Sequence, residues 1–195
     1  MEAFWASLSL VAVAEIGDKT QLLSFVLAAR FRRQQVAIIM GILVATMANH
    51  LVAAYVGDWV AAWLVPEVLR WVLGLAFLGF AVWALVPDTL EDDAVGTPGR
   101  GAFVTATVLF FLAEMGDKTQ LATVALGAQY ASLLAVTAGT TMGMMIANVP
   151  AVLVGERLSQ RFSLQNMRFV AAALFAIFGV LILIGSDLGL GLIPG

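Results

Sequence analysis

Six apolar segments, each long enough to cross a lipid bilayer, dominate this sequence. They cover residues 4–29, 36–57, 67–87, 102–126, 133–154 and 168–186. A helix needs about 20 residues to span the hydrocarbon core. The chain has 195 residues, of which 62% are hydrophobic and 12% are charged, and the charged share is about half that of an ordinary soluble domain. We therefore predict an all-α membrane protein with six transmembrane helices.

Arginine residues predict the orientation of these segments. Seven of the eight arginines lie in or beside the first, third and fifth connections, and they are Arg30, Arg32, Arg33, Arg100, Arg157, Arg161 and Arg168. Only Arg70 lies on the other side. Because positively charged connections stay in the cytoplasm, we expect both termini outside. The third connection, 88–101, is acidic and contains Gly and Pro, which indicates a cytoplasmic linker between a first three-helix repeat at 1–87 and a second at 102–195.

The two halves carry nearly the same nine-residue motif. Residues 14–22 read AEIGDKTQL and residues 113–121 read AEMGDKTQL. The same shift of 99 positions places Asn49 on Asn148, so duplication explains the match better than chance. Since each half has three segments, an odd number, the two copies would cross the membrane in opposite directions. Inverted repeats of this kind are typical of secondary transporters, whose site lies near the midplane where the repeats meet.

Each motif places two carboxylates and a lysine deep in an apolar segment. In a continuous helix, residues three apart lie on one face, one turn along, and two-fold symmetry would bring the two faces together. The group comprises the carboxylates Glu15, Asp18, Glu114 and Asp117 and the charge-balancing residues Lys19 and Lys118. Four carboxylates and two lysines give a formal charge of −2 (−4 plus +2). One divalent cation would neutralise that charge, and so would two protons.

Neutral oxygen donors lie close to these carboxylates in the sequence or at equivalent positions of the two halves. The candidate metal ligands of this kind are Thr20, Thr119, Gln21, Gln120, Asn49 and Asn148. The chain has no cysteine, and six or more oxygen ligands suit Mn²⁺ or Ca²⁺. Gly17 and Gly116 lie inside the motifs, where they weaken a helix and could free backbone carbonyls as further ligands.

His50 follows Asn49, but its counterpart in the second half is Val149. We therefore expect His50 outside the symmetric site, either as a lone polar contact or at the membrane interface.

A purely structural interpretation competes with metal binding. Glu15–Lys19 and Glu114–Lys118 have the i,i+4 spacing of helical ion pairs. However, an unpaired charge at the bilayer centre costs at least about 2.5–3.5 kcal/mol, and ionisable residues at that depth are functional by default. The sequence contains no nucleophile–base group, phosphate loop or cofactor fingerprint, so we expect neither an enzyme nor a prosthetic group. It also lacks the basic stripe of a nucleic-acid-binding protein.

The duplicated Glu-x-Gly-Asp-Lys-Thr, at residues 15–20 and 114–119, resembles the signature of a known transporter family. These are the manganese/calcium–proton antiporters named for transmembrane protein 165 of the Golgi, which include bacterial manganese exporters. The resemblance covers essentially the whole chain. It implies a cation/proton antiporter in which the four motif carboxylates form the metal site. Because the chain lacks the long N-terminal extension of eukaryotic members, we expect a prokaryotic plasma-membrane protein.

Our leading hypothesis is therefore a secondary transporter in the lipid bilayer that exports a divalent cation in exchange for protons. Mn²⁺ is the preferred substrate, Ca²⁺ is the alternative, and the sequence leaves a homo-oligomer open. A second hypothesis is an exporter of a small organic cation such as a basic amino acid, although such a pocket would need aromatic walls. A third is a non-transporting membrane subunit whose ion pairs fix helix packing.

Overall fold

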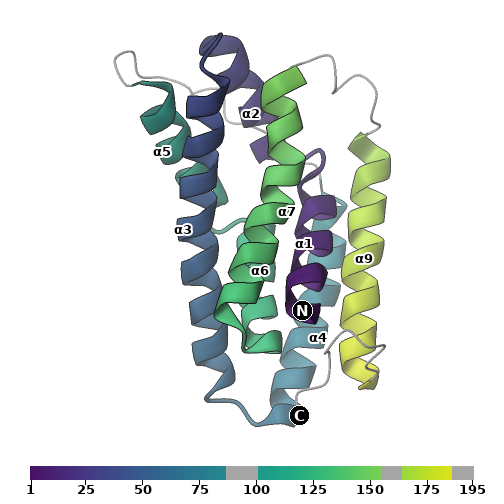
Figure 1. The fold of residues 1–195 in the computed structure, drawn as a ribbon. Coiled ribbons are helices and arrows are strands. Elements are labelled where there is room, and N and C mark those ends of the chain that lie inside the picture. Colours follow the sequence, from purple (N-terminus) through teal and green to yellow (C-terminus); the bar gives the residue numbers. More distant parts are fainter. Residues whose placement is uncertain (87–100, 155–163, 186–195) are drawn as a thin grey trace.

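A computed structural model describes residues 1–86, 101–154 and 164–185, and these residues form eight helices (Figure 1). The first half contains α1 (Glu2–Glu15), α2 (Lys19–Arg30), α3 (Gln35–Ala61) and α4 (Pro66–Ala84). The second half contains α5 (Ala102–Glu114), α6 (Lys118–Tyr130), α7 (Leu133–Val154) and α9 (Leu164–Ile184). Apart from Gly101, the expected acidic linker at 88–101 lies outside the described residues, as do Arg157 and Arg161.

Three of the described helices are long and apolar enough to cross a membrane. They are α3, α4 and α7, and they correspond to the expected segments 36–57, 67–87 and 133–154. Two shorter apolar helices, α5 and the part of α9 from Arg168 to Ile184, lie within the expected segments 102–126 and 168–186. Large apolar side chains on the outer surface, such as Val52, Leu75 and Ile177, are more than half exposed, as contact with lipid requires.

The first and fourth expected segments, 4–29 and 102–126, are broken helices. α1 ends at Glu15 and α2 begins at Lys19, and α5 and α6 are interrupted at the equivalent place. Gly17 has a φ of 86° and Gly116 a φ of 72°, values in the left-handed region that only glycine enters without steric cost. Our expectation that each Glu–Asp pair lies on one continuous helical face was therefore wrong, because the glycine between the two residues reverses the backbone.

Each motif aspartate is the N-cap of the helix that follows the break. The side chain of Asp18 accepts a 2.7 Å hydrogen bond from the backbone N–H of Lys19. Asp117 accepts one of 3.3 Å from the backbone N–H of Thr119. A carboxylate at this position satisfies a donor that the helix itself leaves unpaired and interacts favourably with the helix dipole. The break and the cap together hold both aspartates at a fixed place in the bundle.

The helices of each half pack mainly on helices of the other half. α3 lies against α5, α6 and α7, while α7 lies against α1, α2 and α3, and α4 packs along α9. In Figure 1, α3 and α7 run the length of the bundle, and α1 begins at the same end as α9 finishes. Glycines permit this close approach: a Cβ on Gly139 or Gly143 of α7 would come within 2.4 or 2.7 Å of a backbone oxygen of α1. The two halves are thus interlocked, and the two helix breaks face each other inside the bundle.

Candidate metal site

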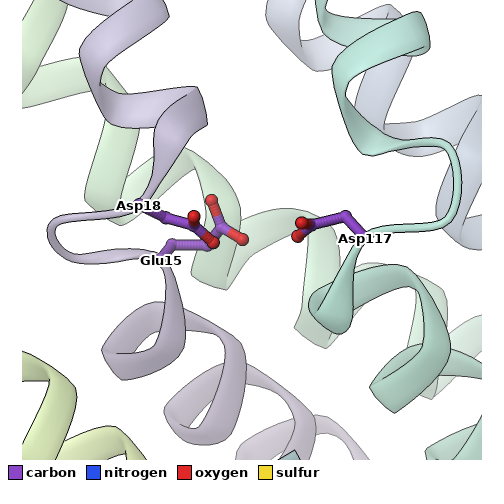
Figure 2. A group of neighbouring side chains, drawn as sticks. All are labelled: Glu15, Asp18 and Asp117. Atoms are coloured by element: carbon purple, nitrogen blue, oxygen red, sulfur yellow. The ribbon is translucent and has the colours of Figure 1, made fainter. Parts of the chain in front are cut away.

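Three carboxylates meet where the two helix breaks face each other. Glu15, Asp18 and Asp117 each place one oxygen within 4.8 Å of the others, and they point toward one another from the two breaks (Figure 2). Glu15 is fully buried, and both aspartates are 2% exposed. Oxygens bound to one cation at 2.3–2.6 Å can lie at most about 5 Å apart. The three side chains are therefore close enough to share a single divalent ion.

The fourth motif carboxylate, Glu114, ends α5 and is also fully buried. It lies outside the group of three, but it stands only three residues before Asp117, which belongs to the group. The structure thus brings three of the four predicted carboxylates into one cluster and places the fourth beside it. The sequence could not distinguish Glu114 from the other three carboxylates, because the position of each side chain depends on how the two broken helices pack together.

The two lysines form ion pairs across the halves. Lys19 Nζ lies 2.9 Å from Oδ1 of Asp117, and Lys118 Nζ lies 3.2 Å from Oδ1 of Asp18. The structural interpretation required an uninterrupted helical turn between each motif glutamate and its lysine, and the glycine breaks remove that turn. Each lysine instead neutralises the aspartate of the opposite half.

Two motif threonines donate hydrogen bonds to carboxylates. The hydroxyl of Thr20 donates to Oε2 of Glu15, and that of Thr119 donates to Oδ2 of Asp117 over 2.9 Å. Even so, Oε1 of Glu15 and both carboxylate oxygens of Glu114 make no hydrogen bond within the described part of the chain. Buried polar atoms are nearly always paired. These orphaned oxygens fit a site that is completed by a cation or by protons.

The motif glutamines brace the two breaks. Oε1 of Gln21 accepts a 3.0 Å hydrogen bond from the backbone N–H of Gly17, and Oε1 of Gln120 accepts one of 2.7 Å from that of Gly116. Gln21 also donates to the carbonyl of Ala147 in α7 over 3.0 Å. Both glutamine oxygens therefore stabilise the left-handed glycine conformation in this structure, and their role as metal ligands stays a prediction.

The two equivalent asparagines connect the broken helices to the long ones. Oδ1 of Asn148 in α7 accepts a 2.7 Å hydrogen bond from Ser24 of α2. The side-chain amide of Asn49 in α3 donates to the carbonyl of Phe111 in α5 over 3.0 Å and accepts from Gln120 at 3.5 Å. Both asparagines are buried next to the motifs. Each oxygen keeps a second lone pair for a cation, and metal ligation by these residues stays a prediction.

His50 lies closer to the site than the sequence indicated. It is fully buried, and its Nε2 is 3.5 Å from Oε2 of Glu114. The expectation of a membrane-interface position was therefore wrong, whereas the lone polar contact is found, with a motif carboxylate as the partner. Sequence comparison of the halves could not reveal this, because Val149 occupies the equivalent position and carries no polar group.

The carboxylates lie away from a large cavity in the bundle. That cavity, of about 680 Å³, is lined by the start of α1, the end of α3 and the connection from α6 to α7, and no motif residue borders it. A second cavity, of about 10 Å³, touches Asp18 and Lys118. The three carboxylates are thus shielded from solvent in this conformation, and the small cavity beside Asp18 has room for about one water molecule.

Comparison with known proteins places this chain in a family. The family model described as "Divalent cation/proton antiporter GDT1" matches residues 3–92 and 102–189. The chain belongs to the GDT1 family. The family membership that the duplicated motif indicated is thereby confirmed. A member of this family is an integral membrane transporter for cations and not an enzyme, so the prediction of no enzymatic activity is also confirmed.

Several GDT1 relatives match along nearly their whole length. A Vibrio cholerae protein named "Putative manganese exporter" is 48% identical over 182 residues, which cover 92% of this chain and 90% of that protein. A GDT1-like protein of Synechocystis is 29% identical and covers 92% of this chain and 96% of its own length. "GDT1-like protein 5" of Arabidopsis thaliana is 27% identical, with 92% and 94% covered. No solved structure matches this chain.

Proposed function

We propose that this GDT1 family member exports Mn²⁺ in exchange for protons. The cation would bind between Glu15, Asp18 and Asp117, with Glu114 completing the set of carboxylates. The observation that carries this proposal is the meeting of three buried carboxylates from two opposed helix breaks. The motif threonines, glutamines and asparagines would supply further oxygens as the cation enters.

Charge balance explains why the cation and protons would exchange. The two cross-half ion pairs neutralise both aspartates, which leaves the charges of Glu15 and Glu114 in an interior that solvent barely reaches. Buried like charges are unfavourable, so the site is stable only when it holds a divalent cation or takes up protons. If the protein changes conformation when the site holds a cation or protons, but not when the site is empty and charged, cation flux and proton flux are coupled.

The membrane arrangement that fits this function has six spans in two inverted repeats. The broken pairs α1–α2 and α5–α6 would form the first and fourth spans, and repeats at 1–87 and 102–195 would be joined by the acidic cytoplasmic linker 88–101. Both termini would lie outside a prokaryotic plasma membrane. The glycine breaks support this arrangement, because discontinuous helices at the repeat interface are typical of transporter sites.

Two observations favour a metal ion as the substrate. The cavity of about 10 Å³ beside Asp18 and Lys118 is far too small for a basic amino acid, which argues against the organic-cation alternative. The choice of Mn²⁺ over Ca²⁺ is supported by the name of the Vibrio cholerae relative, a manganese exporter. Membership of a transporter family argues against the non-transporting subunit.

Transport by purified protein in liposomes tests the proposal. Vesicles would contain a pH-sensitive dye, and Mn²⁺, Ca²⁺, Mg²⁺ and arginine would be offered in turn under an imposed pH gradient. We expect Mn²⁺ to cross the membrane with proton movement in the opposite direction. Mn²⁺ flux without a proton countermovement would contradict antiport, and flux of arginine alone would contradict a metal substrate.

A further inference from the structure

His50 is the single histidine of the chain, and the structure buries it completely in the middle of α3. Within the described residues, neither ring nitrogen makes a hydrogen bond. It faces Glu114, whose own two carboxylate oxygens also lack hydrogen bonds among these residues. An imidazole and a carboxylate without hydrogen bonds are unfavourable in an apolar interior. The pair therefore needs a further partner.

The separation of the two side chains identifies the kind of partner. Nε2 of His50 and Oε2 of Glu114 are 3.5 Å apart, longer than the 2.7–3.2 Å of a good hydrogen bond. Two ligand atoms about 2.0–2.2 Å from one transition-metal ion are separated by roughly 3–3.5 Å. The observed distance thus fits two ligands of a shared cation better than a direct hydrogen bond.

The surroundings place His50 at the edge of the carboxylate cluster. His50 and Glu114 lie outside the group of three carboxylates, but Glu114 stands only three residues before Asp117, so the pair lies beside the helix break that supplies Asp117. One turn before His50 on the same helix, the buried hydroxyl of Thr46 also has no hydrogen-bond partner among the described residues. Unpaired polar groups therefore gather on the face of α3 that is turned toward the site.

We propose that His50 is a nitrogen ligand of the transported cation, acting together with Glu114, and that it makes the site select Mn²⁺ over Ca²⁺. This inference rests on the proposed function. Ca²⁺ takes oxygen ligands, whereas Mn²⁺ belongs to the first-row transition metals, which N/O/S sites bind, although it binds more weakly than the later metals of the row. Because the second half has Val149 at the equivalent position, the first half alone supplies the nitrogen, and the two repeats differ in their contribution to selectivity.

The single histidine permits a direct test by pulsed electron paramagnetic resonance. The protein would be purified through a tag without histidine and loaded with one equivalent of Mn²⁺. We expect the ¹⁴N modulation of a coordinated imidazole, a change to the ¹⁵N pattern after labelling with ¹⁵N-histidine, and its loss in His50→Val. Bound Mn²⁺ without any imidazole coupling would overturn the inference while leaving the proposed function in place. Failure to bind Mn²⁺ at all would overturn both.

A binding comparison provides the second measurement. Affinities for Mn²⁺ and Ca²⁺ would be measured for the wild type and for His50→Gln, which keeps a polar side chain and offers oxygen in place of nitrogen. We expect the preference for Mn²⁺ to fall by about tenfold or more, since loss of even an outer-shell partner costs a metal roughly 10–100-fold in affinity. Ser7→Ala, which removes an equally buried hydroxyl two turns before Glu15, should leave the preference unchanged. An unchanged preference in His50→Gln would overturn the inference.

Discussion

Lys118 of the second half places its Nζ 3.2 Å from Oδ1 of Asp18 in the first half. The mirrored pair joins Lys19 to Asp117 at 2.9 Å. Each half thus supplies the lysine ammonium group that pairs with the aspartate of the other half. Because a buried charge without a partner is strongly destabilising, each motif favours the burial of the other. The two cross-half ion pairs thus help to hold the halves together.

The cross-half ion pair predicts a coupled effect on stability. Lys118→Met should destabilise the protein by about 3–5 kcal/mol, because it leaves the Asp18 charge buried without this partner. Asp18→Asn in the same chain should recover much of that loss. Unfolding in detergent of the two single variants and the double variant measures the coupling. Losses that simply add would contradict a direct interaction between the two side chains.

The left-handed glycine of the second motif predicts a loss that is purely conformational. A Cβ at Gly116 would meet no atom within 4 Å, but φ there is 72°. Gly116→Ala should therefore destabilise the protein by about 1–2 kcal/mol. Gly79 in α4 also has open space around it but has helical backbone, so Gly79→Ala should be neutral or slightly stabilising. Equal shifts in thermal unfolding of the two variants would show that the break does not depend on glycine.

The four motif carboxylates should each be required for transport. We expect severe loss of Mn²⁺ flux, with normal membrane insertion, in the variants Glu15→Gln, Asp18→Asn, Glu114→Gln and Asp117→Asn. Each change removes one charge from a site that must balance a divalent ion. Flux into proteoliposomes measures the effect. Normal flux in two of the variants, one from each half, would rule out the four-carboxylate site.

Substitution of the two asparagines should affect metal binding more than proton movement. Asn49→Ala and Asn148→Ala remove a neutral oxygen that can ligate a cation but cannot titrate, so we expect weaker Mn²⁺ binding and little change in metal-free proton movement. Binding isotherms and dye-monitored proton flux separate the two effects. An equal loss of both would show that the hydrogen bonds to Ser24 and Phe111 make these residues structural.

Metal and protons should compete for the same carboxylate oxygens. Mn²⁺ binding should weaken as the pH falls and should release protons, because ligands must be deprotonated to bind. The strongly interacting carboxylates should titrate as a set. Calorimetric titration with Mn²⁺ in two buffers of different ionisation enthalpy measures the number of protons released. Binding that is independent of pH, with no proton release, would favour a uniporter or a channel.

The sequence predicted which side chains gather at the two helix breaks better than it predicted their arrangement. The duplicated motif pointed to the four carboxylates and two lysines found there, because ionisable groups in apolar segments have few explanations. It did not reveal that both segments break, although Gly17 and Gly116 carried the signal, since an isolated glycine only weakens a helix and its φ depends on the packing around it. His50 could not be placed from the sequence, because comparison of the halves detects only residues that the halves share.

The amino-acid sequence by itself determined that the chain is helical and apolar, that it belongs to a cation transporter family, and that both halves carry the same carboxylate motif. Those properties follow from composition and local pattern, which need no knowledge of distant contacts. Tertiary structure alone decided that Lys19 pairs with Asp117, that Lys118 pairs with Asp18, and that His50 faces Glu114. These partners come from different halves of the chain, and only the close packing of α3 and α7 against the broken helices brings them together.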